Sequence, residues 1–111
     1  MRRDPRKYLH DMRHAVERIR RFTEGKSFQQ YLANDLLQSA VERQFEIIGE
    51  AANQLSRVDP AVAGQLSDLP RMVAFRNMLI HGYAVVDPRV VWGVVEGKLP
   101  ELHRQLNQLL D

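Results

Sequence analysis

The strongest constraint on the fold is a regular spacing of apolar residues in the middle of the chain. Between residues 37 and 55, apolar side chains recur every three or four positions; they are Leu37, Val41, Phe45, Ile48, Ala52 and Leu55. This spacing places them on one face of an α-helix, and other parts of the chain must cover that face. We therefore predict one long helix from about Phe28 or Asn34 to about Ser56.

A second amphipathic helix is predicted near the N-terminus. Asp4-Pro5 is a favourable start, because an aspartate side chain can cap a helix and proline is tolerated at the first helical position. The apolar stripe that follows consists of Tyr8, Met12, Ala15, Ile19 and Phe22. Gly25 is expected to end this helix.

Three further helices are predicted in the second half of the chain. They follow residues 57–70, a segment with two prolines and a glycine that we expect to be a loop with at most a short helical turn. Pro70 should open a helix through His81, with Gly82 as its left-handed C-terminal residue. Asp87-Pro88 begins another helix. The last helix carries one apolar side, formed by Leu99, Leu102, Leu106 and Leu109.

The chain is therefore predicted to be all-α. Its only β-branched run, Val85 to Val95, is interrupted by Asp87-Pro88 and keeps a helical spacing. Short connections between the later helices imply antiparallel packing, so we expect an up-and-down bundle of four or five helices. The length of 111 residues suits a single domain, residues 1–111.

Composition narrows the class of protein. No apolar run approaches the roughly 20 residues that cross a bilayer, and no apolar segment follows the N-terminal charges, so we expect a cytoplasmic protein without a membrane partner. The absence of cysteine excludes disulfides, thiolate catalysis and cysteine-based zinc sites.

The charges are unevenly distributed along the chain. Residues 1–26 hold nine basic and four acidic side chains, whereas residues 34–68 hold two basic and six acidic ones. Thirteen of the sixteen basic residues are arginines, whose forked guanidinium groups suit phosphate and carboxylate. The pattern fits a basic helix that faces an acidic one within the fold, or an arm that faces RNA or a partner protein.

The residues 75–83, FRNMLIHGY, hold the main candidate site. An imidazole such as that of His81 can move protons at neutral pH, the guanidinium of Arg76 can stabilise charge on phosphorus, and Asn77 adds an amide. On an ideal helix Arg76 and His81 lie about 140° apart, but an imidazole released from the helix end could lie beside the arginine. No carboxylate or glycine-rich loop accompanies them, so no metal or cofactor is expected.

The same residues also have structural interpretations. A histidine at a helix end commonly interacts with the last carbonyls and the helix dipole. A tyrosine after a helix-ending glycine, here Tyr83, is commonly a packed ring with its hydroxyl in water.

The stretch RNMLIHGY resembles the R-x4-H-x-Y signature of the HepT-like toxins in the HEPN superfamily. VERQFEIIGEAANQL is similar to the long second helix of that family, and VDPRVVWGVVEGKLPEL resembles its C-terminal part. The three matches follow one another in the expected order and span most of the chain from Val41 to Leu102.

The resemblance implies the toxin of a type VII toxin–antitoxin pair. It implies a helical homodimer, or a higher homo-oligomer, whose paired signatures form a metal-independent endoribonuclease site. In that site His81 acts as general acid or base for attack by the RNA 2′-hydroxyl, and Arg76 holds the scissile phosphate. The implied partner is a minimal nucleotidyltransferase antitoxin, which blocks the site by transferring AMP from ATP to Tyr83.

Three other groups of residues are candidates for chemistry. Glu42, Glu46 and Glu50 form a row on the long helix, either as a polar face or with Glu46 or Glu50 orienting Arg76 across the bundle. His10 and His14 have a spacing that can bind zinc but no nearby third ligand, so a solvated face is favoured. Trp92 is expected in the core or a dimer contact.

Two alternatives to a ribonuclease toxin remain. One is a non-catalytic helical protein that binds a nucleotidyltransferase and is modified by it. The other is an oligomeric bundle without enzymatic activity.

Overall fold

The computed structural model describes residues 4–81 and 86–111, and every regular element in these two ranges is an α-helix. The prediction of an all-α chain is therefore confirmed. The helices are α1 (Pro5–Thr23), α2 (Phe28–Leu32), α3 (Asp35–Val58), α4 (Pro60–Ala63), α5 (Leu69–His81), α6 (Pro88–Gly97) and α7 (Leu99–Leu110). None of the described helices is long and apolar enough to cross a membrane. The cytoplasmic location stays a prediction.

Polar side chains at the helix starts set several of these boundaries. Asp4 accepts a hydrogen bond from the backbone N–H of Arg6, directly before the proline that opens α1. Asn34 accepts one from the N–H of Leu37 at 2.9 Å, so the predicted long helix begins after Asn34 and a separate short helix precedes it. Gly25, with a φ of 72°, follows the end of α1 as expected.

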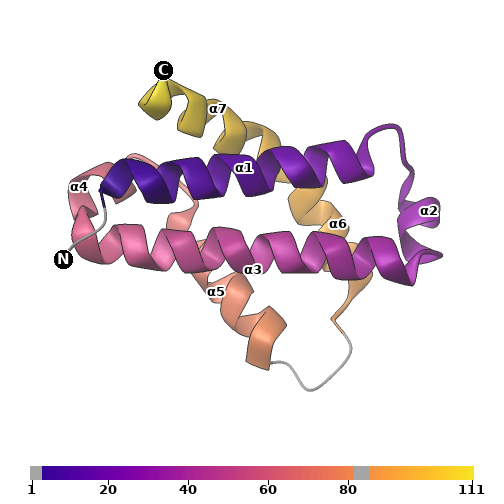
Figure 1. Ribbon diagram of the computed structural model, residues 1–111. Helices are drawn as coiled ribbons and strands as arrows, with labels where there is room; N and C mark the ends of the chain where they lie inside the picture. Colours follow the sequence, from indigo (N-terminus) through magenta and orange to yellow (C-terminus); the bar gives the residue numbers. More distant parts are fainter. Residues whose placement is uncertain (1–3, 82–85) are drawn as a thin grey trace.

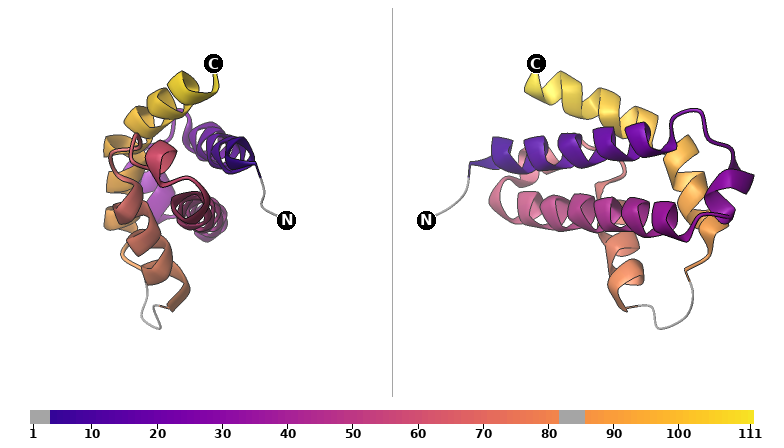
Figure 2. Two further views of the ribbon diagram at one scale, coloured as in Figure 1. Left: turned by 90° about the vertical axis from the view of Figure 1, so that its left-hand side faces the viewer. Right: turned by 45° about the vertical axis from the view of Figure 1, so that its right-hand side comes forward.

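The two longest helices, α1 and α3, lie side by side and run in opposite directions (Figure 1). A second layer behind them consists of α5, α6 and α7, which the side view separates clearly from the first (Figure 2). Helix α5 packs across α3, and its C-terminal end projects beyond the first layer (Figure 1). The basic first helix therefore lies beside the acidic third one, as the charge distribution suggested.

The core lies between these layers, and the predicted apolar stripes form most of it. All six stripe residues of α3 are buried, and four of the five on α1 are buried, while Phe22 is half-buried. In α7 the side chain of Leu110 is buried and that of Leu109 is half-buried. Trp92 is buried with its ring centroid 5.1 Å from that of Tyr31, so of the two predicted places, the core or a dimer contact, it lies in the core.

Candidate functional site

Helix α5 packs closely against α3 at Gly49. A Cβ atom placed on Gly49 would lie 2.2 Å from the Cβ of Arg76 and 3.0 Å from the backbone oxygen of Met72. Real side chains do not tolerate such contacts, so the backbones can come this near only because residue 49 is glycine. This close approach places Arg76 directly against α3.

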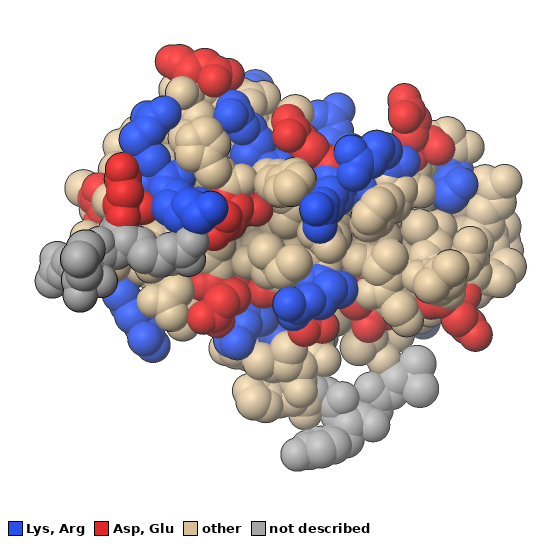
Figure 3. All heavy atoms as spheres, viewed as in Figure 1, with Lys and Arg blue, Asp and Glu red and all other residues tan. Residues whose placement is uncertain are grey.

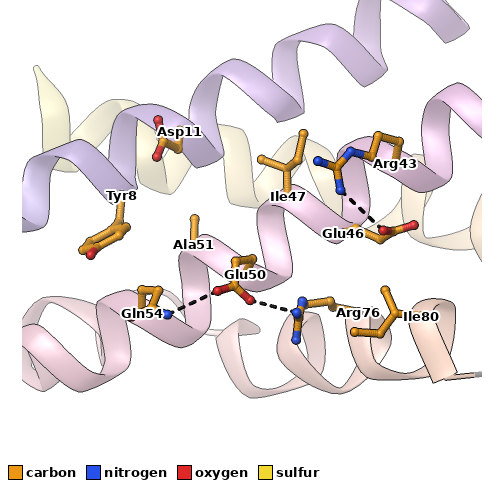
Figure 4. Close-up of a pocket in the computed structure, with 10 residues that line it drawn as sticks. All are labelled: Tyr8, Asp11, Arg43, Glu46, Ile47, Glu50, Ala51, Gln54, Arg76 and Ile80. Atoms are coloured by element: carbon orange, nitrogen blue, oxygen red, sulfur yellow. Dashed lines mark hydrogen bonds and ion pairs between the residues drawn. The ribbon is translucent and has the colours of Figure 1, made fainter.

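The guanidinium group of Arg76 is held by polar partners. Its Nη2 atom lies 2.9 Å from Oε2 of Glu50, and its Nη1 donates a hydrogen bond of 3.4 Å to Oδ1 of Asn77. Glu50 also accepts a 3.2 Å hydrogen bond from Nε2 of Gln54, so its carboxylate is fixed from two sides (Figure 4). The predicted pairing of Arg76 with Glu50 across the bundle is present.

The pair lies in a groove of about 280 Å³ between α1, α3 and α5. Tyr8 and Asp11 line it from α1, and Arg76 and Ile80 line it from α5 (Figure 4). The α3 side is formed by Arg43, Glu46, Ile47, Glu50, Ala51 and Gln54. The groove therefore combines two guanidinium groups with three carboxylates and several apolar side chains.

The three glutamates of the predicted row have different surroundings. Glu50 pairs with Arg76, whereas Oε1 of Glu46 lies 3.5 Å from Nη1 of Arg43 on its own helix. The pKa of Glu42 is raised, first because burial disfavours its charged form and second because Glu46 is nearby. Of the two candidates for orienting Arg76, the geometry therefore selects Glu50.

His81 is the last residue of α5, and its side chain is exposed. Because the helix includes His81, the expectation that its imidazole leaves the helix to lie beside Arg76 is wrong. Among the described residues, Arg76 pairs with Glu50 on α3 and with Asn77 on α5, so one chain does not pair the two signature residues with each other. The predictions for Gly82 and Tyr83 fall outside the described residues.

Helix α5 is apolar on nearly all sides, which is unusual for a helix at a protein surface. Only Leu69 and Met72 are buried among its 13 residues, and Met78 and Ile80 are 44% and 39% exposed. A helix of this composition normally has its faces covered. The partly buried side chains of α5 that pack against the core are Val73, Phe75 and Leu79. Helix α5 is therefore covered on one side only, and His81 lies at its end.

The other candidate positions are surface features. His10 and His14 are exposed on α1, as expected for a solvated face. Within residues 4–81 and 86–111, no group of three or more histidine or acidic side chains is placed to hold a metal ion. Basic and acidic side chains alternate over much of the face that α1 and α3 form (Figure 3).

Two residues of this site were not predicted from the sequence. Gly49 stands inside an otherwise continuous helical pattern, and an isolated glycine there is a signal of close packing. Arg43 lies three residues before Glu46, a spacing that favours an ion pair on one helix, and it shares the groove with Arg76.

Comparison with known proteins identifies the same family that the signature RNMLIHGY resembles. Residues 12–109 match the family described as "Ribonuclease HepT-like". The chain is 35% identical over 113 residues to "Probable ribonuclease HepT" of Thermococcus cleftensis, covering 98% of both chains. It is 31% identical over 108 residues to a "Putative RNase" of Caldanaerobacter subterraneus subsp. tengcongensis, covering 96% of this chain and 94% of the relative. No solved structure matches.

Proposed function

The chain belongs to the HepT-like ribonuclease family, and on that basis we propose that it is a metal-independent endoribonuclease and the toxin of a toxin–antitoxin pair. The observation that carries the proposal is the position of Arg76. Its guanidinium is fixed by Glu50 in an open groove, on the same helix as the exposed His81. In cleavage of an RNA phosphodiester, a fixed cation can stabilise the charge on the phosphate and an accessible imidazole can move the protons.

The proposed reaction uses the RNA 2′-hydroxyl as nucleophile. Its oxygen attacks the adjacent phosphorus, an imidazole of His81 takes its proton, and the bond to the 5′-oxygen of the next nucleotide breaks. A protonated imidazole returns a proton to that leaving oxygen, so the products are a 2′,3′-cyclic phosphate and a 5′-hydroxyl. Arg76 stabilises the charge that develops on the phosphorus oxygens.

We propose that a homodimer completes this site. Arg76 turns towards α3 and His81 towards solvent, so the two groups of one chain do not meet, whereas Arg76 of one protomer can complement His81 of its partner. The uncovered apolar surface of α5 supports this arrangement, because a second copy of the helix would cover it.

The proposed regulator is a nucleotidyltransferase antitoxin that transfers AMP to Tyr83. Tyr83 lies two residues after His81 in the sequence. An AMP group on its hydroxyl would bring bulk and negative charge close to a site that must admit an RNA phosphate.

The test of the proposed function is RNA cleavage by the purified chain in the presence of EDTA. We expect cleavage with 2′,3′-cyclic phosphate ends, and a loss of at least about 100-fold in His81→Ala, as for removal of a general acid or base. His10→Ala removes an exposed histidine from another helix and should cleave like the parent. If the RNA stays intact while the antitoxin modifies Tyr83, the alternative is favoured, in which the chain is a non-catalytic protein that binds the nucleotidyltransferase and is modified by it.

A further inference from the structure

A second arginine, Arg43, shares the groove with Arg76. Both are accompanied by a glutamate of α3: Arg43 by Glu46 at 3.5 Å, and Arg76 by Glu50 at 2.9 Å. The two pairs follow one another along the groove (Figure 4). Glu46 and Glu50 are four residues apart, so the two pairs lie about one helical turn, or about 6 Å, apart along α3.

The two arginines differ in how freely they can meet a ligand. The side chain of Arg76 is 24% exposed, whereas that of Arg43 is 66% exposed. A guanidinium carries five N–H donors, and one carboxylate occupies only part of them. Arg76 is therefore fixed in place, and Arg43 is positioned by Glu46 with most of its donors open to solvent.

The carboxylates of the groove are compensated by basic groups. Glu46 and Glu50 face the two arginines, and Asp11 lies 3.7 Å from Nζ of Lys7. A phosphate that enters the groove therefore meets paired carboxylates and the remaining guanidinium donors. Charge-assisted, forked contacts of this kind are how arginine commonly binds phosphate.

We propose that the groove between α1, α3 and α5 is the path of the RNA strand, and that Arg43 binds the phosphate next to the one held by Arg76. This inference rests on the proposed function and adds a substrate-binding residue to it. Because Arg43 would contact a phosphate next to the reacting one, it binds substrate and transition state alike. Its loss should therefore raise KM and leave kcat nearly unchanged.

The first test measures binding of a single-stranded RNA in which every 2′-oxygen is methylated, so that it can bind but cannot be cleaved. We expect Arg43→Gln to weaken binding about fivefold, and to reduce the slope of log Kd against log salt concentration by about 0.7, the value for one lost phosphate contact. Arg43→Lys should restore the slope. Arg57→Gln, which removes an exposed arginine from α3 outside the groove, should bind like the parent.

The second test compares the kinetics of the same variants on a cleavable RNA. The inference is supported if KM rises about fivefold in Arg43→Gln while kcat stays within about twofold. The inference is overturned if Arg43→Gln and Arg57→Gln have the same affinity for RNA and the same KM. It is overturned even if Arg43→Gln binds an acidic protein partner more weakly than the parent does. If the parent cleaves RNA but Arg43→Gln behaves like Arg57→Gln, the proposed function stands and only the role of Arg43 is rejected. If the parent neither binds nor cleaves RNA, the proposed function and the role of Arg43 are both rejected.

Discussion

Gly49 and Arg76 are in direct contact, and the contact exists because residue 49 has no side chain. The Cβ of an alanine at this position would lie 2.2 Å from the Cβ of Arg76. Both atoms are attached to the backbone, so no rotation of a side chain relieves the clash, and α5 would have to move away from α3. The position of the candidate catalytic arginine therefore depends on a residue of another helix.

Gly49→Ala should lower both stability and RNA cleavage. We expect overpacking to cost about 1–3 kcal/mol in the free energy of unfolding, opposed by a gain of about 1 kcal/mol in helix propensity. Gly93→Ala is the matched control, because no atom lies within 4 Å of a Cβ built on that helical glycine, and this variant should be slightly stabilised. Chemical denaturation measures both variants. A Gly49→Ala protein as stable and active as Gly93→Ala would contradict the proposed role of the contact.

Glu50→Gln should lower kcat while the protein stays folded. The substitution keeps the shape of the side chain but removes the charge that holds Arg76 at 2.9 Å, and we expect a decrease of about tenfold. Single-turnover cleavage and circular dichroism separate the loss of positioning from unfolding. Glu96→Gln, on the exposed side of α6, should cleave at the parental rate. Equal rates in the two variants would show that Glu50 does not orient the arginine.

Mixing two inactive variants tests whether the site is shared between protomers. In a dimer of Arg76→Ala with His81→Ala, one of the two sites would retain both residues if each site takes one from each chain. Random pairing of equal amounts should then restore about a quarter of the parental activity. Co-expression with two different affinity tags allows the mixed species to be isolated and measured. If each chain formed its own site, the mixture would stay inactive.

Glu42→Gln should stabilise the protein at neutral pH and have little effect in acid. Burial, and then the carboxylate of Glu46, raise the pKa of Glu42 in the folded state. Ionised Glu42 therefore costs folding free energy at pH 7, and this cost disappears as pH falls below 4.5, the ordinary pKa of the group. Thermal unfolding of parent and variant across this range measures the difference in Tm. A Tm difference between variant and parent that grows towards acid pH would contradict this prediction.

The fold was largely predictable because the signals that set its helices involve residues close together in the sequence. The stripes of α1 and α3 recur every three or four residues, and Asp4, Asn34 and Asp87 each cap a helix with their own side chain. Each of these signals depends on a few neighbouring residues. The short helix α4, which starts at Pro60 after the capping residue Asp59, was visible only as a possible turn in a loop.

The arrangement of the site was less predictable, for a physical reason. Helix α5 has apolar residues on several sides, so its periodicity does not tell which face meets α3. The crossing of the two helices decides which glutamate of the row reaches Arg76, and that crossing depends on Gly49. The sequence therefore indicated two candidates, Glu46 and Glu50, and only the packing selects one.

The sparse burial of α5 has a consequence for dosage. Two of its 13 residues are buried, and its exposed apolar side chains, Met78 and Ile80, are available to a second copy. If complete sites form only by pairing, doubling the amount of a mostly monomeric chain raises the number of sites about fourfold. Expression level would then act as a threshold, below which the chain is nearly harmless and above which cleavage rises steeply.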